Sequence, residues 1–229
     1  YRAVGSWLGE GDSPLAKFTP EIYPQGSFLL GTVIKPLSDE DEYDIDLVFR
    51  LLILKDQISQ KDLKNLVGDR LKASEVYKHM LDEEGKRCWT IKYAESAQFH
   101  MDILPAIPDE LYSSILQKEG ISVNFASTSI NITDKTLENY SSISNDWPRS
   151  NPKGFAAWFQ SRMLIQYSEL YKRVFGEAFK AEIEKVPNYR IKTPLQRCIQ
   201  LLKRHRDINF MNDQDNKPAS ILITTLAAN

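Results

Sequence analysis

The segment from Tyr43 to Leu54, YDIDLVFRLLIL, constrains the fold of this chain more than any other stretch. It is apolar, partly alternating and bounded by charged loops, which is the pattern of a buried β-strand. Asp44 and Asp46 lie near its start, and residues i and i+2 of a strand point to the same side. We therefore predict a sheet with Ile45 and Leu47 on one face and two carboxylates gathered on the other.

Further elements are predicted around this strand. The first eight residues have the pattern of the end of a helix, and a turn after Pro24 opens a short helix. A longer helix is expected over Lys61–Leu81, and strands over Arg87–Ala94 and Gln98–Ile107. The short loop around Glu95 and Ser96 predicts that these strands form a hairpin, and Pro105 and Pro108 are expected to end the second one.

Near residues 135–150 the sequence pattern changes from mixed strands and helices to helices. We expect a helix over Gly154–Lys185, another that begins at Pro194 with Thr193 as its N-cap, and a last one from Ser220. Trp147, Trp158 and Phe159 could stack on nucleotide bases, but their spacing favours core positions. The fold class is therefore α/β (α+β), with a mixed-sheet lobe over residues 1–140 and a mostly helical lobe over 141–229.

Composition excludes several classes of protein. With 42% hydrophobic residues the chain can build a core, and a net charge of −2 argues against a strong grip on nucleic acid. Cys88 and Cys198 lie in no metal-ligand spacing, and no apolar run approaches the ~18 residues of a membrane span. We expect a cytoplasmic location. Because the first residue is Tyr1 and both ends have incomplete helix patterns, we expect a fragment of a longer protein.

The pair Asp44 and Asp46 is the first candidate site. Two carboxylates side by side on a strand repel each other, and burying them without partners costs several kcal/mol or forces protonation. A bound divalent cation resolves this, and carboxylate oxygens suit Mg²⁺ or Mn²⁺. The alternative is a solvated sheet edge on which such a pair is harmless.

Two further features carry chemistry. Gly26 and Ser27 precede a short helix, and free N–H groups there, with the Ser27 hydroxyl, can hold phosphate oxygens. Asp102 lies in the apolar run FHMDILP, where a carboxylate is costly without a partner. Each has an ordinary alternative, a loop turn and an edge-strand aspartate. We expect His100 to lie on the other face of the strand from Asp102, away from the chemistry.

In combination these features are more specific. A Gly-Ser turn, a strand with Asp-x-Asp and a later strand with a single Asp resemble the nucleotidyltransferase superfamily of DNA polymerase beta. The runs QGSFLLGTVIKPL, EYDIDLVF, FHMDILPAIP and SNPKGFAAWFQSR resemble the bacterial cyclic-oligonucleotide synthases, the CD-NTases of anti-phage CBASS systems. The likeness extends from about Val4 to the end. The sixteen residues between Ser27 and Asp44 exceed the usual superfamily spacing, and the acidic loop at 38–42 can absorb the excess.

The resemblance assigns roles to individual residues. Asp44, Asp46 and Asp102 would hold two Mg²⁺ or Mn²⁺ ions, and Gly26 and Ser27 would bind the triphosphate. In the helical lobe, Lys203 and Ser220 occupy places where animal relatives contact nucleotide phosphates. For Lys203 the alternative is a solvated helix face, and for Ser220 it is a plain N-cap.

The resemblance also implies an activity. The expected enzyme is a nucleotidyltransferase that makes a cyclic di- or trinucleotide messenger from ATP and a second nucleoside triphosphate, with GTP as a candidate. A regulatory protein partner and a downstream effector that responds to the product are expected as well. Two alternatives stay open: a transferase that modifies RNA, protein or a small molecule, and a non-catalytic nucleotide-binding scaffold.

Overall fold

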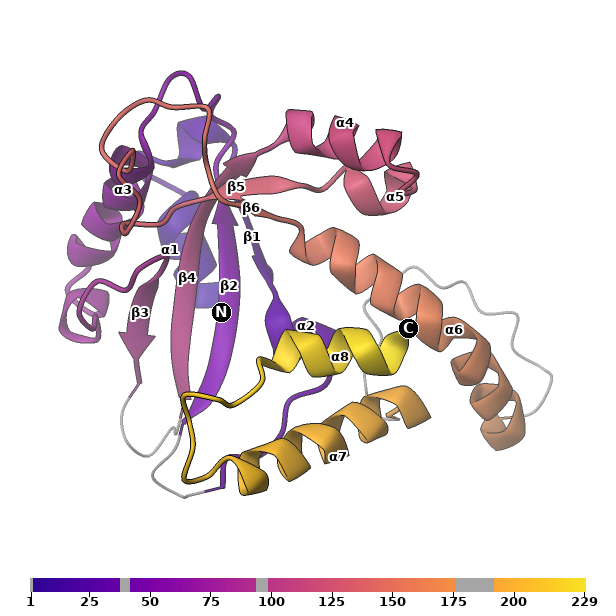
Figure 1. Ribbon diagram of the computed structural model, residues 1–229. Coiled ribbons are helices and arrows are strands. Elements are labelled where there is room, and N and C mark those ends of the chain that lie inside the picture. The colour runs from indigo at the N-terminus through magenta and orange to yellow at the C-terminus, as the bar shows by residue number, and fades with distance from the viewer. Residues whose placement is uncertain (1, 38–41, 94–98, 176–191) are drawn as a thin grey trace. The chain divides into compact units, whose positions relative to one another are not determined.

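The computed structural model describes residues 2–37, 42–93, 99–175 and 192–229 (Figure 1). The chain separates into two compact units: Tyr1–Gly26 with Ser38–Phe155, and Ser27–Leu37 with Ala156–Asn229. The short segment 27–37 thus groups with a much later part of the sequence. The division into lobes over residues 1–140 and 141–229 stays a prediction.

The first unit is built on one mixed sheet. Its strands among the described residues are β1 (Glu21–Pro24), β2 (Tyr43–Arg50), β3 (Trp89–Lys92), β4 (Phe99–Pro108), β5 (Ile130–Ile132) and β6 (Arg149–Ser150). Their order is β1-β2-β4-β5-β6, and β3 pairs with the first half of β4. β2 and β4 run parallel at the centre, whereas the other pairings are antiparallel.

One face of this sheet carries the larger core. Leu47 and Phe49 of β2 and Met101 and Ile103 of β4 are almost fully buried there. Helices α1 (Arg2–Gly9) and α3 (Gln60–Lys72) supply the covering apolar side chains, and both helices flank the sheet in Figure 1. The same alternation turns Asp44, Asp46 and Val48 to the opposite face.

The hairpin of β3 and β4 is confirmed, although its predicted loop falls on residues 94–98, outside the described residues. The prediction that Pro105 ends the strand is wrong, because β4 continues to Pro108. Pro105 lies between the residues of β4 paired with β3, which end at Ile103, and those paired with β5, which begin at Ala106. That edge of β4 therefore does not need the N–H that proline lacks.

Two other elements are shorter than predicted. The helix expected to reach Leu81 ends at Lys72, and a 3₁₀ turn follows at Tyr77–His79. The hydroxyl of Ser74 accepts hydrogen bonds from the N–H groups of Val76 and Tyr77, a local alternative to continued helix. The central strand ends at Arg50. The remaining elements of this unit are η1 (Ala16–Phe18), α4 (Glu110–Lys118) and α5 (Val123–Ala126).

Helices form the second unit. α6 (Pro152–Phe175) enters it from the first, and the continuation predicted to Lys185 lies outside the described residues. α7 (Pro194–Asn209) starts as predicted: Thr193 and Gln196 form a reciprocal capping box, with Pro194 in the first turn. α8 (Ser220–Ala228) packs against α7. No helix among the described residues is long and apolar enough to cross a bilayer.

The segment that follows α2 (Gly26–Leu30) has no regular structure of its own, yet its carbonyls are paired. Two side chains one turn apart on α7 donate here: Gln196 to the carbonyl of Leu30, the last residue of α2, at 2.9 Å, and Gln200 to that of Val33 at 2.6 Å. This polar side of α7 replaces the missing backbone partners. Of the three aromatic residues expected in the core, Trp147 and Phe159 are buried and Trp158 is half-buried.

Candidate active site

The three aspartates predicted to act together meet on one face of the sheet. Asp46 in β2 lies directly opposite Asp102 in β4, and Asp44 lies opposite His100. Because the two strands are adjacent and parallel, the predicted face of each falls on the same side. One ligand atom from each of Asp44, His100 and Asp102 lies within 4.8 Å of the others.

Gly26 lies against this cluster. The N–H of Gln25 donates to the carbonyl of Asp46 at 2.9 Å, which fixes the turn next to β2. Gly26 has a φ of +58°, and a Cβ at this position would overlap the Oδ2 atom of Asp46. Glycine is therefore required twice here, for the left-handed backbone and for the close approach of a carboxylate.

Two of the carboxylates, those of Asp44 and Asp46, resist ionisation. Burial, and then the carboxylates of Asp44 and Asp102, raise the pKa of Asp46 to about 6. Partial burial and Asp102 also raise the pKa of Asp44, while His100 opposes this. The ionised cluster thus carries negative charge that the protein does not fully compensate.

This donor set fits a divalent cation. Asp44 and Asp102, together with His100, place ligand atoms close enough for one ion, and the nearby Asp46 carries an unfavourable charge of the kind that a bound cation removes. Oxygen donors of this type suit Mg²⁺ or Mn²⁺. The structure therefore supports a metal site at this place.

Thr90 is a site residue that the sequence reasoning missed. Its hydroxyl donates to Asp102 Oδ1 at 2.5 Å, from the strand on the other side of β4. The register of β3 and β4 is centred on residue 96, so Thr90 lies opposite Asp102. The signal was present, because the predicted loop around Glu95 and Ser96 already implies this pairing.

The prediction that His100 faces away from Asp102 is wrong. Residues 100 and 102 are two apart in one strand, so both side chains point to the same face. The Nε2 atom of His100 lies 3.3 Å from Asp44 Oδ1, and its Nδ1 atom lies 3.3 Å from Glu42 Oε2. His100 therefore belongs to the cluster, and Glu42 contacts the ring nitrogen that does not face Asp44.

Lys203 does not lie on a solvated helix face. Only 4% of it is exposed, and its Nζ atom is 3.2 Å from both the carbonyl and the hydroxyl of Thr32. Burial, and then the guanidinium of Arg206, lower the pKa of Lys203 to about 8. Within the second unit this lysine thus anchors the segment after α2, and its contact with a triphosphate stays a prediction.

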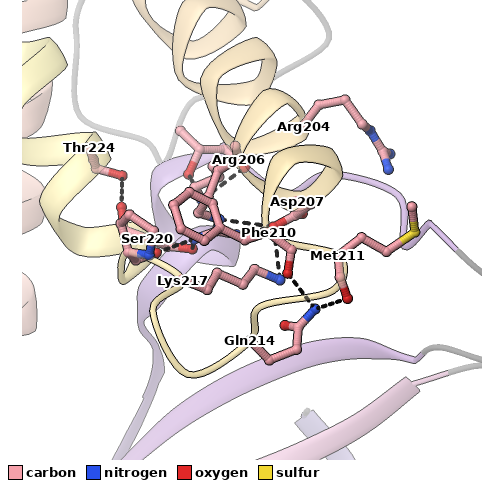
Figure 2. A network of polar contacts seen from close by, with 12 residues as sticks. Arg204, Arg206, Asp207, Phe210, Met211, Gln214, Lys217, Ser220 and Thr224 are labelled. Carbon is pink, nitrogen blue, oxygen red and sulfur yellow. Dashed lines mark hydrogen bonds and ion pairs between the residues drawn. The ribbon is translucent and has the colours of Figure 1, made fainter.

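Ser220 is held in a polar network at the turn between α7 and α8 (Figure 2). Its hydroxyl accepts a hydrogen bond from Arg206 at 2.8 Å, and Arg206 and Lys217 both pair with Asp207. The N-cap of α8 is Ala219, so the plain N-cap alternative for Ser220 is wrong. Ser27, the second residue of α2, also belongs to this unit, and its phosphate role stays a prediction.

The fold and the acidic cluster define a class. A mixed sheet with two aspartates on one central strand and a third on its parallel neighbour, beside a glycine turn, is the arrangement of a polymerase-beta-like nucleotidyltransferase. Residues 20–105 match the family described as "Cyclic GMP-AMP synthase DncV-like, nucleotidyltransferase domain". This stretch contains Gly26 and all three aspartates.

The likeness extends beyond this stretch to curated bacterial proteins. The chain is 34% identical over 228 residues to a c-di-GMP synthase of Roseivirga ehrenbergii, a match that covers all of this chain and 53% of the relative. It is 28% identical to the cyclic dinucleotide synthase CdnG of Bradyrhizobium diazoefficiens, covering 98% of this chain and 51% of that protein. The chain thus spans about half the length of these curated relatives.

Solved structures show the same fold. CdnG of Bradyrhizobium diazoefficiens, in complex with GTP, superimposes with a TM-score of 0.66 at 23% identity, covering 100% of this chain and 62% of that one. DncV of Vibrio cholerae, in complex with a linear intermediate, gives a TM-score of 0.56 at 20% identity, covering 90% of this chain and 45% of that one. At these identities the likeness concerns the fold.

Proposed function

We propose that the protein is a metal-dependent nucleotidyltransferase that makes a cyclic dinucleotide from nucleoside triphosphates. The observation that carries this proposal is the convergence of Asp44, Asp46 and Asp102 on one sheet face beside Gly26. The curated relatives, which are named as cyclic dinucleotide synthases, support it. The same reaction could also close a ring of three nucleotides, and product analysis would distinguish a cyclic trinucleotide from a cyclic dinucleotide.

The reaction is a transfer of a nucleotidyl group. A ribose hydroxyl oxygen attacks the α-phosphorus of a triphosphate, the bond to the bridging oxygen of the β-phosphate breaks, and pyrophosphate leaves. Asp44, Asp46 and Asp102 would hold two Mg²⁺ or Mn²⁺ ions, which supply positive charge for the attacking and leaving oxygens. Asp102 accepts the hydroxyl proton, and the hydrogen bond from Thr90 keeps its carboxylate oriented toward the cluster.

The phosphate-binding residues complete the proposal. The backbone at Gly26 and the hydroxyl of Ser27 hold the triphosphate at the start of α2. By the family resemblance, Lys203 and Ser220 also contact the nucleotide phosphates. The ammonium group of Lys203 has three N–H donors, and the carbonyl and hydroxyl of Thr32 accept hydrogen bonds from two of them. The third N–H can therefore bind a phosphate oxygen.

We infer that GTP is a substrate, alone or together with ATP. The support comes from the relatives, because one is named a c-di-GMP synthase and the structure of CdnG holds GTP. By the same family reasoning, the product acts as a messenger in the cytoplasm during anti-phage defence. A downstream effector would respond to it, and a protein partner would regulate its synthesis.

Incubation of the full-length protein with labelled ATP and GTP tests the proposal. We expect phosphatase-resistant cyclic products with Mg²⁺ or Mn²⁺ and none in the presence of a chelator, with mass spectrometry identifying the bases. Asp102→Asn should abolish the product, whereas Asp56→Asn, a matched change at an exposed aspartate of the same unit, should leave it unchanged. Wild-type turnover by an Asp102→Asn variant would contradict the site assignment.

The same experiment separates the alternatives. Label that appears only on added RNA, protein or a small molecule would support a modifying transferase. Binding of nucleotide without turnover, with or without cell extract, would support a scaffold. Activity that appears only when extract is added would support an enzyme that waits for its regulatory partner.

A further inference from the structure

His100 lies within the acidic cluster, but the proposed roles of the three aspartates give its imidazole no function. His100 lies opposite Asp44 across the parallel strands and two residues before Asp102. Its Nε2 atom is 3.3 Å from Asp44 Oδ1. A ligand atom of each of these three residues lies within 4.8 Å of the other two, which is close enough for one ion to contact all three.

Glu42 provides an independent indication of how the ring is oriented. Its Oε2 atom is 3.3 Å from His100 Nδ1, on the side of the ring away from Asp44. Histidines that bind metals commonly donate the proton of their second nitrogen to a carboxylate, which fixes the tautomer and directs the free lone pair at the ion. A proton on Nδ1 shared with Glu42 leaves the Nε2 lone pair directed toward the aspartates.

We propose that His100 is a nitrogen ligand of the divalent ion held by Asp44 and Asp102, and that Glu42 orients it. The inference rests on the proposed function, because it concerns the same metal site. It adds a nitrogen donor, which the acidic triad does not contain. The neighbouring cation on this face, Lys92, lies opposite His100 and is paired with Asp82 at 2.7 Å, so it does not neutralise the cluster.

The nitrogen donor has a consequence for the choice of ion. Mg²⁺ favours oxygen ligands, whereas imidazole suits transition metals and affinities for a mixed site rise from Mn²⁺ through Co²⁺. The site should therefore bind Mn²⁺ and Co²⁺ more tightly than Mg²⁺. Loss of the imidazole should weaken binding of the transition metals more than binding of Mg²⁺.

Electron paramagnetic resonance of Mn²⁺ bound to the full-length protein tests this directly. Pulsed spectra of the wild type should show nitrogen-14 modulation from a coordinated imidazole. The modulation should disappear in His100→Ala and persist in His79→Ala, a matched change at an exposed histidine of the same unit. We expect the Kd for Mn²⁺ to rise about tenfold or more in His100→Ala, and about tenfold in Glu42→Gln with the modulation retained.

The outcomes distinguish this inference from the proposed function. Bound Mn²⁺ without nitrogen modulation in the wild type would refute ligation by His100, and this result does not depend on how any variant folds. Tighter Mn²⁺ binding by His100→Ala would also refute it and show that the ring competes with the ion for Asp44. Unchanged Mn²⁺ binding by Asp102→Asn would instead overturn the acidic metal site and the proposed function with it.

Discussion

The charge imbalance at Asp46 leads to a prediction about stability as well as catalysis. Burial and the two neighbouring aspartates raise the pKa of Asp46 from 3.8 to about 6, so the folded state disfavours its ionised form. A tenfold change in a protonation equilibrium corresponds to about 1.4 kcal/mol, and the whole difference therefore corresponds to about 3 kcal/mol. At neutral pH and without metal, the wild type should therefore be about 3 kcal/mol less stable than a variant whose residue 46 carries no charge.

The pH dependence follows from the direction of this change. A raised pKa in the folded state means that the penalty is absent below pH 3.8, where Asp46 is protonated in both states. The penalty grows between pH 4 and pH 6 and is fully present above pH 6. Asp46→Asn carries no charge at this position and should not show this dependence.

Urea unfolding in the presence of a chelator measures the effect. At pH 7.5 the free energy of unfolding of Asp46→Asn should exceed that of the wild type by about 3 kcal/mol, and the difference should vanish near pH 4. Saturating Mn²⁺ should stabilise the wild type more than the variant, because a ligand that binds only the folded state adds to its stability. Asp56→Asn should change stability by less than about 0.5 kcal/mol.

The reasoning would be refuted by an Asp46→Asn variant that is less stable than the wild type at pH 7.5 without metal. A stability difference that does not change between pH 4 and pH 7.5 would refute it as well. In either case the cluster would be compensated by contacts other than a bound ion.

Three further substitutions test the surroundings of the cluster. Gly26→Ala should lower the free energy of unfolding by about 1–2 kcal/mol, because alanine is strained in the left-handed backbone conformation of this residue. It should also lower turnover at least tenfold, because the added Cβ displaces Asp46. Urea unfolding and steady-state kinetics measure the two effects. Thr90→Val should lower kcat about tenfold with little change in KM, because Asp102 loses its hydrogen bond, whereas Thr90→Ser should retain activity; equal kcat values for Val and Ser would contradict this role. Thr193→Ala should lower the melting temperature through loss of about 1 kcal/mol of helix capping, and an unchanged melting temperature would show that the capping box is dispensable.

Local rules predicted the parts of this protein that depend on neighbouring residues in the chain. The alternation around Asp44 and Asp46 places both carboxylates on one face whatever the strand pairs with. The helix start at Thr193 and Pro194 likewise follows from capping chemistry within a few residues. The resemblance to a family added the third aspartate, Asp102, by position.

Tertiary structure decided what depends on the pairing of distant segments. His100 joins the cluster because β2 and β4 are parallel neighbours in a register that places it opposite Asp44. Lys203 can be buried because the carbonyl of Thr32, 171 residues earlier in the chain, accepts a hydrogen bond from its ammonium group. A sequence specifies which groups need partners, but which distant backbone or side chain satisfies them is fixed only when the chain packs, because each unpaired buried polar group is costly.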